Sequence, residues 1–178
     1  MEDQTDRLAE VRALRTRGIQ CAKKLQNEQA EALYWQAFRL HEKVLGPNDP
    51  TIAESLNQII FFYGIQWRRT EVEPLVERSL TLLRQQRASK HKGVLQTLDS
   101  LASHACSLAH YDDAKWYYEQ VLKARQELLG PNHPRVAGTL EKYAKMLHGL
   151  KREDEAQSLE ERAAVIRGRQ SRKTEADR

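Results

Sequence analysis

A five-residue loop that returns after 84 residues constrains this chain more than any other feature. Gly46-Pro47-Asn48-Asp49-Pro50 recurs as Gly130-Pro131-Asn132-His133-Pro134. Half of that spacing is 42 residues, and a middle copy that begins at Ala88 aligns with both without a gap, although its Gly-Pro signature is lost. Self-similarity at a fixed period of this size is typical of repeat architectures. The sequence therefore predicts four units, near residues 4–45, 46–87, 88–129 and 130–171.

Each unit is expected to form a pair of helices. Apolar residues recur at three- and four-residue steps, which marks one face of a helix. In the second unit this pattern holds for Ile52, Leu56, Ile59, Ile60 and Tyr63, and again for Val72, Leu75, Val76, Leu80 and Leu83. A hairpin of this kind cannot bury its apolar stripe alone. Stacking of neighbouring units buries it, so we expect a solenoid over residues 1–171.

Polar residues mark the expected helix ends. Thr70 with Glu73 predicts a capping box, and Asp112 fills the equivalent cap position in the third unit. Pro74 is expected in the first turn, where a missing amide donor costs little. The Gly-Pro loops are expected to end each second helix and to separate it from the next unit.

Composition excludes several protein classes. Only 8 Gly and 5 Pro occur in 178 residues, which excludes collagen-like, low-complexity and turn-rich all-β chains. No stretch approaches the ~20 apolar residues of a membrane helix, so no membrane insertion is expected. The two cysteines predict neither a disulfide framework nor a zinc site. The acidic N-terminus lacks the features of a signal or transit peptide, which favours a cytoplasmic protein.

The net charge of +4 comes largely from one end of the chain. Basic residues gather near the C-terminus, and residues 172–178 are predicted to be a disordered, charged tail. Elsewhere positive and negative residues are interspersed, which is typical of solvated helix faces. No nucleic-acid partner is expected, because such binders concentrate their basic residues on one face.

Aligned by the 42-residue period, the units resemble tetratricopeptide repeats, and the Gly-Pro-Asn-His-Pro loop resembles that of the kinesin-light-chain type. A small residue recurs where paired helices must approach closely, at Gly18, Ala102 and Ala144. The other columns are represented by Leu98, Leu101, Ala105, Ala114 and Tyr118 in the third unit and by Leu140, Tyr143, Leu147, Ala156 and Glu160 in the fourth. The resemblance implies an all-α, right-handed α-solenoid of about eight helices in four helix-turn-helix units.

The resemblance also implies a concave groove, lined by the first helix of each unit, that holds an extended peptide or partner segment. The residues in those columns are Arg12, Arg15, Ile19, Lys23, Glu54, Asn57, Phe61, Ile65, Gln96, Asp99, Ser103, Cys106, Glu141, Lys145 and His148. Asn57 stands where the family has a groove asparagine, whereas Asp99 and Glu141 replace it in later units. Basic residues of the first unit suggest an acidic partner segment. The alternative is a solvated helix face with incidental charge.

Catalytic and metal motifs are not found in the sequence. His41-Glu42 does not extend to the His-Glu-x-x-His pattern of a zinc helix, and His133 occupies a loop column. Cys21 is expected to be a small core residue, and a reactive thiol at Cys106 is a minor alternative. We therefore expect no enzyme activity, no cofactor and no bound metal.

Aromatic residues divide into two groups. Tyr34, Phe38, Tyr63 and Tyr118 fall in core columns. Trp67 and Trp116 fall in columns that tolerate many residue types, which suggests half-exposed rings and a convex-face contact, self-association included. The alternative is that these rings cover the joints between repeats.

The sequence thus favours a non-catalytic adaptor or scaffold whose concave groove binds a protein or peptide. The alternative is a self-associating structural subunit of a larger assembly, that is, a homo-oligomer. A helical-repeat RNA binder is disfavoured, because it requires a basic groove that bears aromatic residues. Fold alone does not fix function, so both readings rest on resemblance.

Overall fold

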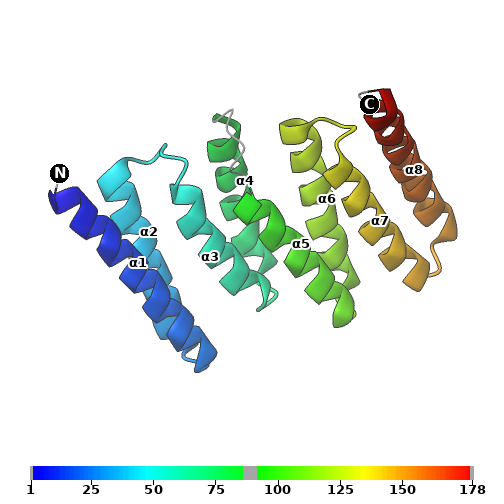
Figure 1. The fold of residues 1–178 in the computed structure, drawn as a ribbon. Helices are drawn as coiled ribbons and strands as arrows, with labels where there is room; N and C mark the ends of the chain where they lie inside the picture. The colour runs from blue at the N-terminus through cyan, green and yellow to red at the C-terminus, as the bar shows by residue number, and fades with distance from the viewer. Residues whose placement is uncertain (1, 86–91, 177–178) are drawn as a thin grey trace. The chain divides into compact units, whose positions relative to one another are not determined.

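Eight helices account for nearly all of the chain that the structure, a computed structural model, describes, namely residues 2–85 and 92–176 (Figure 1). They are α1 (Glu2–Lys23), α2 (Asn27–Leu45), α3 (Ile52–Gly64), α4 (Arg69–Gln85), α5 (Lys92–Ser107), α6 (Tyr111–Leu129), α7 (Pro134–Gly149) and α8 (Glu153–Ala176). No strand occurs in these ranges. The prediction of an all-α fold built from four helix-turn-helix units is confirmed.

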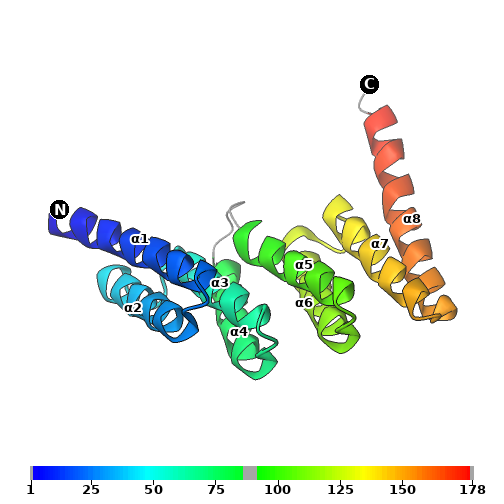
Figure 2. The same ribbon diagram turned by 90° about the horizontal axis from the view of Figure 1, so that it is seen from below.

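The helices fall into two compact units, residues 1–97 and 98–178. In residues 1–97, α1 packs along α2, α2 against α3, and α3 against α4 (Figure 2). In residues 98–178, α6 packs against α7, and α7 against α8. A single continuous solenoid over residues 1–171 stays a prediction.

One backbone turn joins the two helices in all four units. One residue of the turn after each first helix has a positive φ of 58–61°, at Leu25, Trp67, Ala109 and Lys151, which are spaced by 42 residues. The next amide donates to a carbonyl five residues back, as from Gln26 to Cys21 at 3.0 Å. This is the Schellman arrangement, which satisfies carbonyls at the end of a helix. The same turn therefore sets the start of every second helix.

The Gly-Pro loops end helices through glycine. Gly46 and Gly130 have φ of 86° and 90°, a region that other residues rarely adopt. Their amides donate to the carbonyls of Glu42 and Gln126, which closes the last turns of α2 and α6. These two loops end the second helix of their units, as the sequence predicts.

The apolar columns form the core. Leu56, Ile60, Leu98, Leu140 and Ala144 are fully buried. The predicted core aromatics are buried as well, at Tyr34, Phe38, Tyr63 and Tyr118.

Close approach of α1 and α2 depends on Gly18. A Cβ atom at this position would lie 2.7 Å from Cε1 of Tyr34, whose ring is buried. The ring cannot withdraw without disturbing its neighbours, because protein interiors are close-packed. The predicted role of the small column is thus visible in the first unit.

Three expectations about helix ends are wrong. α4 begins at Arg69, so Thr70 lies inside the helix and its hydroxyl donates to Glu71 rather than forming a capping box. α6 begins at Tyr111, which places Asp112 in the first turn and not at the cap. Pro74 lies beyond the first turn of α4. The common cause is the Schellman turn, which leads straight into the second helix a residue or two earlier than the side chains suggest.

The expectation of a disordered tail stays a prediction, and the structure extends the last helix into it. α8 continues to Ala176, so residues 172–176 are helical, while residues 177–178 lie outside the described range. After Gly168 no glycine or proline follows that would end the helix. The segment is rich in Arg, Lys, Gln and Glu, which are good helix formers.

A matched pair of glycine substitutions tests the close approach at Gly18. Gly18→Ala is expected to lower the free energy of unfolding by about 1–3 kcal/mol, because the new methyl group overpacks against Tyr34. Gly168→Ala adds a methyl group where nothing lies within 4 Å, so it is expected to be neutral or stabilising. Denaturant unfolding followed by circular dichroism measures both. Equal effects of the two substitutions would contradict the packing role of Gly18.

Candidate partner-binding surface

The predicted groove residues of the first two repeats lie on one surface, which we call the α1–α3 face. It comprises Arg12, Arg15, Ile19 and Lys23 of α1 and Glu54, Asn57, Phe61 and Ile65 of α3 and its C-terminal end. Two neighbouring pockets are lined by residues of both helices. Seven of these residues line the two pockets, and Arg12 lies exposed on α1 outside both.

One pocket of the α1–α3 face is apolar. It has a volume of about 420 Å³ and is lined by Ile19, Phe61, Ile65, Tyr34 and Phe62, together with Ala22, Gln58 and Lys23. Ile19, Phe61 and Ile65 are exposed by 38%, 46% and 38%. Lys23 carries the one charge among the lining residues. The pocket therefore offers apolar contact beside an ammonium group.

The second pocket has a mixed lining with more polar groups than the first, and we call it the polar pocket. Its volume is about 280 Å³, and its lining includes Arg15, Glu54, Asn57, Leu83 and Gly93. Arg15 Nη1 lies 3.5 Å from Glu54 Oε2. The amide oxygen of Asn57 is buried and has no hydrogen-bond donor among the described residues. A buried acceptor in this state is destabilising until a donor reaches it.

Comparison with the other repeats explains why Asn57 lacks a donor. In the third repeat Arg125 of the second helix pairs with Asp99 of the first, and in the fourth Arg167 pairs with Glu141. Leu83 occupies the equivalent position in the second repeat. A leucine cannot donate a hydrogen bond, so the amide oxygen of Asn57 stays unsatisfied.

Within residues 98–178, the acidic residues predicted to line the groove are paired with other residues of the protein. Asp99 accepts from Arg125, which also donates to the hydroxyl of Thr139. Arg167 contacts Glu141 with two bonds of 3.0 Å, and the hydrogen bond from Arg167 lowers the pKa of Glu141.

The remaining predicted groove residues show varied surroundings. Ser103 is exposed, and its hydroxyl donates to the carbonyl of Asp99. Lys145 and Gln96 are exposed. The expected separation of charge is therefore weaker than the sequence suggests, because Arg15, Asp99 and Glu141 each have an oppositely charged neighbour within the protein.

Sequence reasoning missed a buried polar chain in the first two repeats. His41 Nδ1 lies 2.8 Å from Ser55 Oγ, and its Nε2 lies 3.5 Å from Thr51 Oγ1, which in turn contacts Asp49. The order of groups resembles a hydrolase triad. Ser55 is only 2% exposed, however, so no substrate can reach its hydroxyl. The chain is structural, and burial followed by the charge of Arg15 lowers the pKa of His41.

A signal for this missed contact exists in the sequence. His41, Leu83, Arg125 and Arg167 share one column of the 42-residue period, and Ser55, Thr97 and Thr139 share another. Because polar residues recur in both columns at the same spacing, a contact between the two columns is expected. The structure has it between His41 and Ser55 and between Arg125 and Thr139.

The two tryptophan expectations have different outcomes. Trp116 is 7% exposed, and its ring packs edge-on against Tyr117 with centroids 5.1 Å apart, so the predicted convex contact at Trp116 is wrong. The other residues of its column, Ala32, Pro74 and Ser158, are exposed, so the column does not give the depth of Trp116. Trp67 is half-buried, and its column varies because it is the positive-φ position of the turn.

Other reactive groups have ordinary structural roles. Burial raises the pKa of Cys106, which disfavours a reactive thiolate, and Cys21 is only half-buried instead of fully enclosed. His148 lies between Glu153 and Glu160, and the hydrogen bonds that its ring donates to the two carboxylates raise its pKa. Across residues 2–85 and 92–176, no group of three His, Cys, Asp or Glu residues is placed to hold a metal ion. Within the same ranges, every helix is too short or too polar to cross a bilayer.

Comparison with known families now identifies the repeat. Models described as tetratricopeptide repeat match residues 26–51 and 101–167, which cover parts of both compact units. The chain belongs to the tetratricopeptide-repeat family. Such repeats serve in general as protein-interaction scaffolds and are generally not enzymes. No curated protein matches the chain.

Two solved structures share the tetratricopeptide fold of this chain. The TPR-like repeats of a putative kinesin light chain from Podosopora anserina are 20% identical, with a TM-score of 0.58 over 91% of this chain and 77% of that one. BtubC (BKLC) from P. vanneervenii is 21% identical, with a TM-score of 0.54 over 94% of this chain and 72% of that one. At this level of identity the likeness concerns the fold alone.

The Asp99–Arg125 pair yields a stability prediction. Asp99→Asn is expected to lower the free energy of unfolding by about 3 kcal/mol, because it leaves the buried Arg125 without a counter-charge. Arg125→Leu combined with Asp99→Asn recreates the Leu83 and Asn57 found in the second repeat, and is expected to lose less stability than Asp99→Asn alone, because no unpaired charge stays buried. Denaturant unfolding measures both variants. Additive losses in the double variant would contradict the coupling of the two residues.

His41 yields a pH prediction. Because its pKa is lowered in the folded state, the unfolded chain binds its proton more readily, so stability falls as the pH drops below about 6.5. The double variant His41→Leu with Ser55→Ala, which imitates Leu83 and removes the orphaned hydroxyl, is expected to flatten this fall. His148→Gln provides the control, because a raised pKa adds stability at low pH and its loss steepens the fall. Unfolding curves at several pH values would refute the assignment if the double variant kept the native slope.

Proposed function

We propose that this chain is a non-catalytic adaptor that holds an extended protein segment on the α1–α3 face. The observation that carries the proposal is the exposure of Ile19, Phe61 and Ile65 side by side in one pocket. Clustered apolar side chains on a surface mark interaction sites, because their burial by a partner is favourable. A single apolar side chain of the partner in this pocket would act as its anchor, since a few residues supply most binding energy.

The polar pocket supports the same proposal. Asn57 lines this pocket and is half-buried as a residue, so a turn of its side chain brings the amide oxygen, which lacks a donor inside the described protein, to a backbone N–H of an extended segment. Relief of an unsatisfied buried acceptor is worth about 1–3 kcal/mol, which makes this contact comparable to an apolar anchor. Because both pockets are lined by α1 and α3, one segment can reach both.

The partner segment is proposed to carry acidic residues. Lys23 lines the apolar pocket, and Arg12 is exposed on the same helix. Arg15 contributes less, because Glu54 lies beside it. Exposed charges of this kind act mainly on association rate and selectivity, and their effect weakens with salt.

Selection from a displayed library of random peptides tests the proposal. We expect selected peptides to combine an apolar residue with nearby acidic residues. Phe61→Ser is expected to weaken their binding by about tenfold or more, because it removes the pocket wall. Lys23→Glu is expected to weaken acidic peptides and spare those without acidic residues.

Val165→Ser is the matched control, because Val165 is also an exposed apolar residue but lies on α8. It is expected to leave peptide affinity unchanged. Peptides that bind the native chain and the Phe61→Ser variant equally well would refute the α1–α3 face as the binding site.

A further inference from the structure

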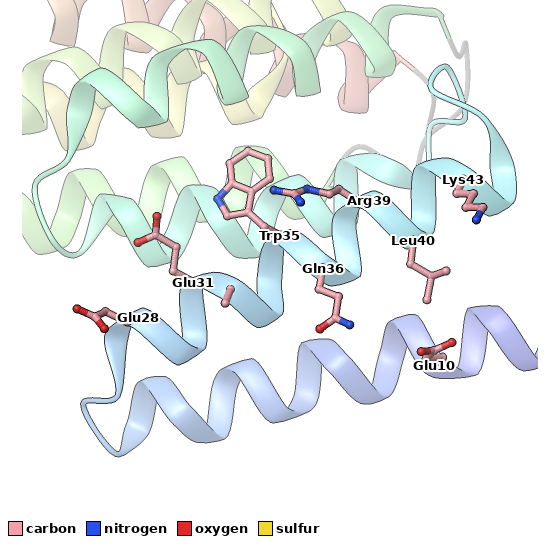
Figure 3. Close-up of a pocket in the computed structure, with 9 residues that line it drawn as sticks. Glu10, Glu28, Glu31, Trp35, Gln36, Arg39, Leu40 and Lys43 are labelled. Atoms are coloured by element: carbon pink, nitrogen blue, oxygen red, sulfur yellow. The ribbon is translucent and has the colours of Figure 1, made fainter.

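The outer surface of α2 carries a stripe of residues that the proposed function does not use. We call it the α2 outer face, and it comprises Glu28, Ala32, Trp35, Gln36, Arg39 and Lys43. These residues line an open hollow together with Glu31, Leu40 and Glu10 of α1. Figure 3 shows Glu31, Trp35 and Arg39 projecting on one side of α2 and Gln36 and Leu40 on the other. None of them belongs to the α1–α3 face.

Trp35 departs from its own repeat column. The equivalent residues in the later repeats are Glu77, Glu119 and Glu161, all suited to a solvated helix surface. The indole of Trp35 is half-buried, and its Nε1 donates to the Tyr63 hydroxyl at 2.8 Å. Its ring packs edge-on against Phe38 with centroids 5.5 Å apart. A rigid, half-exposed tryptophan on an otherwise polar column is typical of an interface anchor.

A hydrogen-bonded network fixes the surroundings of Trp35. The Tyr63 hydroxyl donates to Glu31 at 2.7 Å, and Arg68 Nη1 donates to the same carboxylate at 2.7 Å. The guanidinium of Arg68 lies 4.1 Å above the Tyr63 ring. The hydrogen bond from Arg68 is the main cause of the lowered pKa of Glu31, so this carboxylate stays ionised. The ring of Trp35 is thereby held in one position before any partner arrives.

The charges of the α2 outer face are ordered about Trp35. Glu28 precedes it by seven residues and Lys43 follows it by eight, with Glu31 and Arg39 nearer to the ring on either side. At 1.5 Å per residue, the acidic and basic ends lie about 11 Å from the centre. Acidic residues at the start and basic residues at the end of a helix also complement its dipole. That effect does not account for a tryptophan midway between them.

We propose that a second copy of this chain binds the α2 outer face, with the two α2 helices packed antiparallel about a twofold axis beside Trp35 and Gln36. In such a pair each Glu28 faces Lys43 of the other copy, and each Ala32 faces Arg39. The two Trp35 rings meet at the centre. A twofold interface must be self-complementary. The α2 outer face meets this condition, because its acidic end faces the basic end of the other copy and its tryptophan lies at the centre.

Charge reversal distinguishes this dimer from other associations. Sedimentation velocity of the native chain, from micromolar to near-millimolar concentration, is expected to show a monomer–dimer equilibrium. Glu28→Lys places like charges opposite Lys43, and Lys43→Glu places like charges opposite Glu28. Each variant alone is expected to have a dimer dissociation constant raised by about tenfold or more.

An equimolar mixture of the two variants provides the decisive measurement. In the mixed dimer the lysine introduced at position 28 faces the glutamate introduced at position 43, and the native Lys43 and Glu28 face each other. The mixture is therefore expected to dimerise about as strongly as the native chain. Trp35→Glu, the residue type of the later repeats, is expected to be monomeric with unchanged helix content by circular dichroism.

Lys123→Glu is the matched control, because Lys123 is exposed and occupies the Arg39 column on α6. It makes the same charge change and is expected to leave dimerisation unchanged. A native chain that stays monomeric over the whole concentration range would overturn the proposal. A native dimer that resists both charge reversals, or a mixture that stays monomeric, would overturn it as well.

Discussion

The backbone turn that joins the two helices of each unit is the constraint on which the rest of the structure depends. A helical pair buries its apolar stripe only if the second helix starts at a fixed angle and distance from the first. The bond from Gln26 to the Cys21 carbonyl, repeated at 42-residue intervals, fixes that start. With this geometry set, Gly18 can meet Tyr34 closely, and the apolar columns close into a core. Side-chain caps are then not required, and Thr70 and Asp112 lie inside the second helices instead of at their ends.

A single column of the second helices decides how much of each first helix is available to a partner. Arg125 and Arg167 occupy the carboxylates of Asp99 and Glu141, and His41 is turned inward to Ser55. Leu83 alone engages nothing polar on the first helix of its repeat, which leaves the Asn57 amide oxygen unsatisfied. Repeats with one backbone can thus differ in the polar groups that the first helix leaves unpaired through one residue of the second helix.

The period of 42 residues predicted the helical pairs, the glycine loops and the core aromatics, because these follow from backbone geometry and apolar spacing. The columns also placed Arg15, Asn57 and Phe61 on one face. They could not predict which charges are engaged inside the protein, since that depends on contacts between helices, as for Asp99 with Arg125. They also failed at Trp116, where a variable column was read as exposed. Position along the sequence gives the face of a helix, but it does not give the depth to which neighbours cover it.

The positive-φ residues of the four turns have a consequence for how such a protein diverges. Leu25, Trp67, Ala109 and Lys151 share one backbone conformation but no common chemistry, and Leu25 is 83% exposed. The turn therefore constrains the backbone at these positions and scarcely constrains the side chain. The tip of each hairpin can carry any of four unlike side chains, because the backbone hydrogen bonds behind it hold the turn.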